Sequence, residues 1–143
     1  TADGSKTIFI DELQEGYHSH NGALQEAEHV FIKNGINKVK NYEINILELG
    51  FGTGLNLMTL YQFWKDLKAS GAAVRPITFV SFELYPFKRE TLSKLHTQME
   101  LDPLFSKPLL DAYPEDLFFG LHSRSIDNSG FNRFRNCCFC YFF

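Results

Sequence analysis

The chain has 143 residues, of which 44% are hydrophobic and 22% charged, and its formal net charge is −3. This length allows one domain with a hydrophobic core, and the composition excludes an intrinsically disordered chain. Because acidic residues slightly outnumber basic ones, the net charge does not indicate a positively charged surface that would bind nucleic acid. We find no signal peptide and no long apolar run, so no membrane partner is expected. The sequence starts with Thr1 rather than Met, so we expect a processed, trimmed or partial chain.

The N-terminal quarter predicts a hairpin and a helix. Residues 7–10 (Thr-Ile-Phe-Ile) form a short strand candidate, and residues 17–19 are its expected return strand after a polar turn. Apolar residues at helical spacing over residues 22–33 predict the helix, with Gly35 as its C-terminal stop.

The centre of the chain carries its most informative motif. An apolar strand over residues 44–49 runs directly into three glycines at alternate positions, Gly50, Gly52 and Gly54. A helical pattern starts at once after them and ends at Gly71. Glycines permit a tight turn and a close approach of a ligand to the backbone, and a helix N-terminus favours a nucleotide-like ligand. Leu55 stands where a dinucleotide fingerprint has its third glycine, which favours an S-adenosylmethionine (AdoMet) loop over an NAD loop.

A second strand–helix pair follows the first. Residues 77–82 predict a buried strand, and Pro86 is expected in the first turn of a helix that packs through Leu92, Leu95 and Met99. Alternating strands and helices predict an α/β fold with parallel strands. A ligand of such a sheet lies at the carboxyl ends of its strands.

Three polar side chains near these strand ends are candidates for the cofactor site. Glu83 ends the second strand and could accept hydrogen bonds from ribose hydroxyls, or could be only an exposed carboxylate. Glu48 lies inside the first strand and needs a partner, either the ammonium of a bound cofactor or a local lysine. Asn56 could cap the helix or touch the ligand, with capping favoured.

The histidines and cysteines do not form a metal site. His18, His20 and His29 fit no ligand spacing and are interpreted as solvated or hydrogen-bonded side chains. The three cysteines, at positions 137, 138 and 140, have no upstream partner for a disulfide and lack the spacing of zinc ligands. A reduced, cytoplasmic setting is therefore expected.

The C-terminal segment shows neither a helical stripe nor a strand alternation. Aromatic residues and cysteines crowd the last dozen positions. We interpret residues 118–143 as a tail foreign to the domain, which then covers residues 1–117; an irregular native terminus is the alternative.

Three segments in this order resemble one family: Tyr-His-Ser-x-x-Gly-Ala-Leu-Gln-Glu-Ala-Glu-His-Val-Phe (17–31), Glu-Leu-Gly-Phe-Gly-Thr-Gly-Leu-Asn (48–56) and Phe-Val-Ser-Phe-Glu-Leu-Tyr-Pro-Phe (79–87). They are similar to the methyltransferase module of the bacterial enzymes that complete 5-methylaminomethyl-(2-thio)uridine at the tRNA wobble position (MnmC/MnmD type). The resemblance implies a Rossmann-like AdoMet-dependent methyltransferase fold with an incomplete parallel sheet, flanking helices and an N-terminal hairpin plus helix.

The resemblance also implies a function and a set of site residues. The activity is AdoMet-dependent methylation of the aminomethyl group of uridine 34, with tRNA as partner. The family's cofactor-binding positions correspond to Gly50, Gly52, Gly54 and Glu83. Glu26 and Phe31 match the N-terminal segment that closes over the cofactor.

Basic side chains are the candidates for contact with tRNA phosphates, although a solvated helix face is the favoured interpretation of most of them. They are Arg75, Lys88, Arg89 and Lys94.

One departure from the family concerns a later loop beside the transferred methyl group. Residues 111–114 (Asp-Ala-Tyr-Pro) are similar to that loop but come early in the chain, so a simple turn is favoured. The later strands of the sheet also look missing, so the chain is expected to be C-terminally truncated and potentially inactive. No catalytic residue is assigned. The alternatives are an NAD(P)-type oxidoreductase and a non-catalytic fragment that self-associates through exposed apolar surface.

Overall fold

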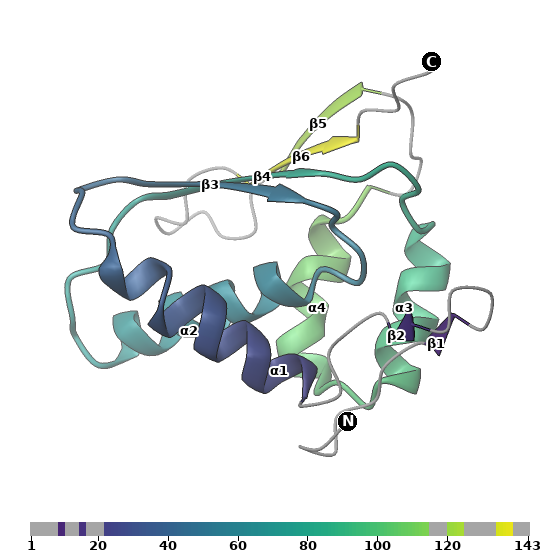
Figure 1. Ribbon diagram of the computed structural model, residues 1–143, viewed down its shortest axis with the longest axis horizontal. Helices are drawn as coiled ribbons and strands as arrows, with labels where there is room; N and C mark the ends of the chain where they lie inside the picture. Colours follow the sequence, from purple (N-terminus) through teal and green to yellow (C-terminus); the bar gives the residue numbers. More distant parts are fainter. Residues whose placement is uncertain (1–8, 11–14, 17–21, 115–119, 125–133, 139–143) are drawn as a thin grey trace.

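A four-stranded mixed sheet carries the helices on one of its faces in the computed structural model (Figure 1). The structure describes residues 9–10, 15–16, 22–114, 120–124 and 134–138. The strand order is β3-β4-β6-β5, with bounds Ile44–Leu49 for β3, Ile77–Phe82 for β4, Phe134–Cys138 for β6 and Gly120–Arg124 for β5. The predicted α/β class with a small parallel sheet is confirmed.

Parallel pairing of β3 with β4 is the centre of the sheet. The register runs from Ile44 opposite Ile77 to Leu49 opposite Phe82, so the carboxyl ends of the two strands coincide. Strand β6 pairs in parallel with the other side of β4, and β5 pairs antiparallel with β6. The segment after residue 117 shows no strand alternation in its sequence, yet β5 and β6 lie within it. These strands depend on pairing with distant segments, which local side-chain periodicity does not reveal. The domain boundary at residue 117 stays a prediction.

The N-terminal elements agree with the sequence in type and differ in their bounds. Strands β1 (Phe9–Ile10) and β2 (Glu15–Gly16) form an antiparallel hairpin, so the return strand begins before the predicted residues 17–19, which lie outside the described residues. The predicted helix is α1 (Ala23–Glu26) continued as a π-helix, η1 (Ala27–Lys33). Asn34 is the C-cap and Gly35 follows it directly, at the position of the predicted stop, before the short 3₁₀-helix η2 (Ile36–Lys38).

Helix α2 (Leu55–Ala69) supplies more residues to the buried core cluster than any other described element. Its fully buried side chains include Leu57, Leu60 and Trp64, which fall at the predicted helical spacing. They pack in one cluster with Phe79 of β4 and Leu92 of the third helix. The hydrophobic stripe of the sequence is thus the face that α2 turns to the sheet.

Two helices follow β4, and the sequence predicted only the first of them. Helix α3 runs over Arg89–Gln98 with Lys88 as its N-cap, so Pro86 precedes the helix and does not lie in its first turn. Helix α4 (Pro103–Ala112) was missed. Its start has a clear signature, because Asp102 accepts a hydrogen bond from the Leu104 N–H at 2.8 Å and a proline occupies the first turn.

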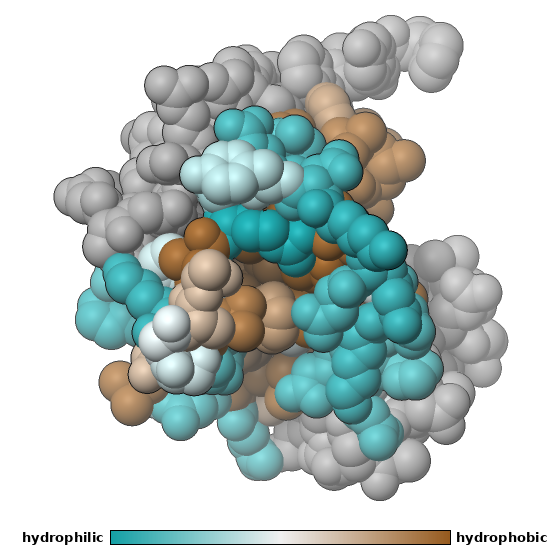
Figure 2. Space-filling view, turned by 90° about the vertical axis from the view of Figure 1, so that its left-hand side faces the viewer, coloured by the Kyte–Doolittle hydropathy of each residue, from teal (hydrophilic) through white to brown (hydrophobic). Residues whose placement is uncertain are grey.

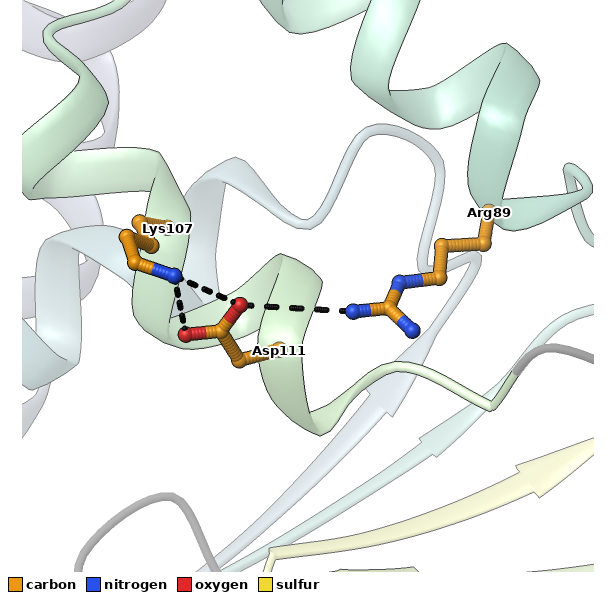
Figure 3. A network of polar contacts seen from close by, with 3 residues as sticks. All are labelled: Arg89, Lys107 and Asp111. Atoms are coloured by element: carbon orange, nitrogen blue, oxygen red, sulfur yellow. Dashed lines mark hydrogen bonds and ion pairs between the residues drawn. The ribbon is translucent and has the colours of Figure 1, made fainter.

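The two helices are joined by an ion network at the surface. Asp111, in the last turn of α4, pairs with Lys107 one turn earlier at 2.7 Å and with Arg89 at the start of α3 at 4.0 Å (Figure 3). All three side chains are at least partly solvated, so the network fixes the helix ends rather than adding much stability.

Arg75 has a structural role. Its guanidinium donates hydrogen bonds to the backbone carbonyls of Ile36, Val39 and Asn41 and so ties the segment after η2 to the chain before β4. Since its donors are directed at the backbone, the sequence-based suggestion that Arg75 binds tRNA phosphates gains no support.

The outer face of the parallel pair is open to solvent. Leu47 and Leu49 of β3 are 67% and 80% exposed, and every labelled helix lies on the opposite face (Figure 1). At the end of the molecule shown in Figure 2, hydrophilic side chains predominate and hydrophobic ones reach the surface between them.

The placement of α4 predicts a contrast between two of its leucines. Leu109 is 1% exposed and Leu104 is 76% exposed. We expect Leu109→Ala to lower the free energy of unfolding by about 2–5 kcal/mol because it leaves a cavity, and Leu104→Ala to change it by less than about 0.5 kcal/mol. Urea unfolding followed by the fluorescence of the single tryptophan, Trp64, measures both. Equal losses would contradict the described orientation of α4.

Candidate functional site at the carboxyl ends of β3 and β4

The loop between β3 and α2 has a backbone that only glycine adopts readily. Gly50, Gly52 and Gly54 have φ values of 84°, 55° and 76°, all in the left-handed region. The Gly50 N–H donates to the Phe82 carbonyl at 2.7 Å, and the Gly54 N–H donates to the Phe51 carbonyl at 2.9 Å. The loop therefore turns tightly after β3, next to the carboxyl end of β4, and leads directly into α2. A Cβ built on Gly50 would meet no atom within 4 Å, so the loop has open space on that side.

Glu83 links this loop to the end of β4. Its Oε2 accepts a hydrogen bond from the Gly52 N–H at 2.9 Å, and its Oε1 accepts one from the Tyr85 N–H at 2.9 Å. Glu83 is therefore not simply an exposed carboxylate at a strand end, which was the alternative interpretation of its sequence position. A carboxylate has about four acceptor positions, so two backbone donors leave capacity for the hydroxyls of a ligand.

Glu48 is the second carboxylate of the site and faces the helices. Ser81, directly opposite on β4, donates to its Oε2 at 2.6 Å, and the Asn56 side chain donates to its Oε1 at 3.0 Å. Neither expected partner, a lysine or a bound ammonium, is needed to place it. Burial raises the pKa of Glu48, the two hydrogen bonds oppose that shift, and the charge of Glu83 adds to it.

Asn56 does not cap α2. The N-cap residue is Gly54, which has no side chain, and Asn56 stands in the first turn with its amide on Glu48. The favoured interpretation of Asn56 as a cap is wrong, because the buried carboxylate two positions before the loop competes for its amide. The amide and the Ser81 hydroxyl together form the polar floor of the site.

Buried residues from the two following helices support the loop from beneath. His96 of α3 contacts the Thr53 carbonyl through Nε2 at 2.8 Å, and burial lowers the pKa of its imidazole. Tyr113, just after α4, stacks on Phe51 with ring centroids 5.9 Å apart, and its hydroxyl donates to the Phe87 carbonyl at 2.9 Å. The sequence analysis did not identify His96 and considered Tyr113 only as part of residues 111–114, because the roles of both residues depend on tertiary contacts.

The two N-terminal candidates lie apart from this polar centre. Glu26 is exposed on α1, and among the described residues no hydrogen bond or ion pair joins its side chain to the loop or to either carboxylate. Phe31 is partly buried and packs edge-on against Phe79, at 6.3 Å between centroids, in the core beneath β4. His29 is exposed, whereas His18 and His20 lie outside the described residues.

The similarity of residues 111–114 to a catalytic loop is not supported. Asp111 and Ala112 end α4, Tyr113 caps that helix and Pro114 follows it. Asp111 already binds two cations, Lys107 and Arg89 (Figure 3). The interpretation of these residues as a turn is closer, although two of the four residues end a helix that the sequence analysis missed.

The basic candidates of α3 lie at or near its surface. Lys94 pairs with Glu90 at 2.6 Å, Arg89 belongs to the network with Asp111, and Lys88 is exposed. Within the described part of the chain, no group of three or more His, Cys, Asp or Glu could hold a metal ion, and no helix is long and apolar enough to cross a membrane.

The arrangement can hold a polar ligand at the carboxyl edge of the sheet. It joins two carboxylates, an amide and a hydroxyl to the N-terminus of α2, whose first N–H groups have no partner within the helix. Carboxylates of this kind accept hydrogen bonds from hydroxyls and stabilise positive charge. The chemistry fits a ligand that carries both hydroxyl groups and a cation.

Gly54 and Gly71 provide a test of how tightly the loop is packed. Both have positive φ, but a Cβ on Gly54 would lie 2.5 Å from Leu109 Cδ2, whereas one on Gly71 meets nothing within 4 Å. We expect Gly54→Ala to cost about 2–5 kcal/mol of unfolding free energy, from strain and overpacking together, and Gly71→Ala about 1–2 kcal/mol from strain alone. Urea unfolding of the two variants measures both losses of unfolding free energy. Similar losses would show that the contact between a Gly54 Cβ and Leu109 adds nothing to the backbone strain.

The raised pKa of Glu48 predicts a pH dependence of stability. Between 4.5 and its folded pKa the folded chain holds a proton that the unfolded chain has released, so stability is lost as pH rises through this window. Unfolding free energies of the wild type and Glu48→Gln, measured by urea from pH 4 to 8, should diverge in favour of the variant as pH rises. Glu43→Gln, which alters an exposed carboxyl next to β3, is the control. Parallel curves for the wild type and Glu48→Gln would contradict the conclusion that folding raises the pKa of Glu48.

We compared the sequence and the fold with those of known proteins. No family model matches the sequence. The chain is 37% identical over 127 residues to the tRNA 5-methylaminomethyl-2-thiouridine biosynthesis bifunctional protein MnmC of Cupriavidus metallidurans, which covers 85% of this chain and 18% of that protein. The protein of the same name from Leptospira interrogans is 35% identical over 122 residues, covering 81% of this chain and 18% of its own length.

A crystal structure of MNMC2 from Aquifex Aeolicus matches 68% of this chain and 35% of its own, with 29% sequence identity and a TM-score of 0.48. The chain spans less than a fifth of the length of the two MnmC proteins. The matched region nevertheless covers more than four fifths of this chain in both comparisons. The chain is therefore a relative of the MnmC proteins of tRNA modification, similar to them over most of its own length.

Proposed function

We propose that the chain forms the AdoMet-binding part of a methyltransferase that acts on the aminomethyl group of the wobble uridine in tRNA. The observation that carries this proposal is the hydrogen bond between the Gly52 N–H and Glu83 at 2.9 Å. It places an acidic side chain from the end of β4 directly beside a left-handed glycine loop that opens α2. The names of the MnmC relatives supply the tRNA modification.

The residues present fit the proposed cofactor. Glu83 has acceptor capacity left for ribose hydroxyls after binding two backbone N–H groups. Open space next to Gly50 allows a ligand to approach the backbone. The carboxylates Glu48 and Glu83 place negative charge at the strand ends, which suits a cofactor that carries a sulfonium and an ammonium group.

Methyl transfer requires positioning more than acid–base chemistry. AdoMet supplies an activated methyl group, so the protein mainly has to hold the acceptor amine and the methyl carbon in line. In this proposal the glycine loop and Glu83 fix the cofactor, and Glu48 with Asn56 and Ser81 forms the polar floor beneath it. No residue of the chain is assigned as the base that deprotonates the amine.

Calorimetric titration with AdoMet tests the cofactor. We expect saturable binding by the wild type and at least about tenfold weaker binding by Glu83→Gln, because a charged acceptor contributes roughly 1.5–3 kcal/mol. The matched control is Glu90→Gln, an exposed carboxyl on α3 that pairs with Lys94, which should bind as the wild type does. Circular dichroism and Trp64 fluorescence establish that each variant is folded.

The outcomes separate the alternatives. No binding of AdoMet by a folded wild-type chain would overturn the proposed cofactor, and saturable binding of NADH in its place would support an oxidoreductase. If AdoMet binds, transfer of radiolabelled methyl from AdoMet to tRNA that carries the aminomethyl group tests the acceptor. Binding without transfer would restrict the proposal for this chain to the cofactor site.

A further inference from the structure

His96 makes a buried polar contact with the glycine loop from a distant part of the chain. Its side chain comes from the last turn of α3, and the residue is 2% exposed. Nε2 lies 2.8 Å from the backbone carbonyl oxygen of Thr53, which is itself buried between Gly52 and Gly54. A carbonyl oxygen only accepts hydrogen bonds, so Nε2 must carry the proton and donate it.

The other ring nitrogen shows that this histidine is not there for packing alone. Nδ1 is buried and has no hydrogen-bond partner among the described residues. An unpaired buried polar atom costs about 1–3 kcal/mol, and a leucine of similar size would avoid that cost. Burial also lowers the pKa of the imidazole, which favours the neutral ring. Among the described residues, the hydrogen bond that the imidazole makes in return is the one to the Thr53 carbonyl.

This hydrogen bond acts on the Thr53–Gly54 peptide plane, whose Gly54 N–H also donates to the Phe51 carbonyl at 2.9 Å. Next to Thr53, Gly54 is enclosed by Leu109 of α4 and by Phe51, on which Tyr113 stacks. On the other side of the loop, Glu83 accepts the Gly52 N–H. Two successive parts of the loop backbone are therefore fixed by side chains, one N–H by Glu83 and one carbonyl by His96.

We propose that His96 is a positioning residue of the cofactor-binding loop, which orients the Thr53–Gly54 peptide so that the loop is preset for its ligand. His96 touches neither the ligand nor the reacting atoms and acts through Thr53. The statement that the loop is preset for AdoMet rests on the proposed function. The statement that His96 orients the Thr53–Gly54 peptide does not depend on that function.

Two substitutions separate positioning from packing. His96→Gln can retain an N–H donor toward Thr53, whereas His96→Leu fills the space without a donor. We expect His96→Leu to bind AdoMet about 5–10-fold more weakly, which corresponds to the loss of one hydrogen bond of about 1–1.4 kcal/mol. His96→Gln should stay within about threefold of the wild type. His29→Leu, at an exposed histidine, is the control for loss of an imidazole.

Stability provides the readout that a merely structural role would not give. His96→Leu removes the unpaired Nδ1 but also removes a donor from the buried Thr53 carbonyl, so the two effects on stability oppose each other. We expect its urea midpoint to stay close to that of the wild type while it binds AdoMet less well. Unchanged affinity in His96→Leu would overturn the proposal, and so would losses of affinity and stability in both variants in equal proportion. His96→Met, also without a donor, replaces His96→Leu if that variant does not fold.

A measurement without cofactor keeps this inference distinct from the proposed function. Hydrogen exchange of the Gly54 amide, which donates to the Phe51 carbonyl, reports on the same peptide plane in the free protein. We expect exchange to be several-fold faster in His96→Leu and unchanged in His96→Gln. If the wild type fails to bind AdoMet, the proposed function falls, and this exchange result alone decides the role of His96. Equal exchange in all three proteins would contradict it.

Discussion

The candidate site depends on the parallel register of β3 and β4. That register sets Glu48 opposite Ser81, and beyond the strand ends it brings the Gly52 N–H within 2.9 Å of Glu83. Shifting either strand by one residue would turn its side chains to the other face of the sheet and would separate Glu48 from Ser81. The two carboxylates, the glycine loop and the start of α2 therefore form one unit only because the strands end together.

The glycine loop is held from two sides by different kinds of contact. Above the strand ends, Glu83 binds the loop backbone through a charged hydrogen bond. Beneath it, the support comes from α3 and α4, through His96 on the Thr53 carbonyl and through Leu109 against Gly54. A loop with three left-handed residues has many conformations in an unfolded chain, so such contacts offset the cost of ordering it. Rigidity of this kind suits a site that works by positioning.

The polar groups of the site carry electrostatic costs that the packing must offset. Burial disfavours the charged form of Glu48, and the charge of Glu83 nearby adds to the effect. Hydrogen bonds from Ser81 and Asn56 reduce this cost without removing it. One ring nitrogen of His96 has no hydrogen-bond partner among the residues that the structure describes. Departures of this sort from the most stable arrangement are expected at functional sites more than in an ordinary core.

The sequence by itself determined the elements that depend on local pattern. Mostly apolar segments determine β3 and β4, and the hydrophobic stripe through Leu57, Leu60 and Trp64 determines α2. Alternate glycines determine the left-handed loop between β3 and α2. These signals are local because backbone conformation and helical periodicity are properties of neighbouring residues. The same residues carried the resemblance to the MnmC family.

Tertiary structure decided what side chains do once distant segments meet. Asn56 binds Glu48 rather than capping its helix, Arg75 holds backbone carbonyls, and His96 supports a loop 43 positions earlier in the chain. Helix α4 escaped prediction although Asp102 and Pro103 mark its start, because Pro108 interrupts its pattern. Strands β5 and β6 form through pairing with β4 and with each other. Contacts between residues far apart in sequence have no local signature, and for that reason only the folded chain reveals them.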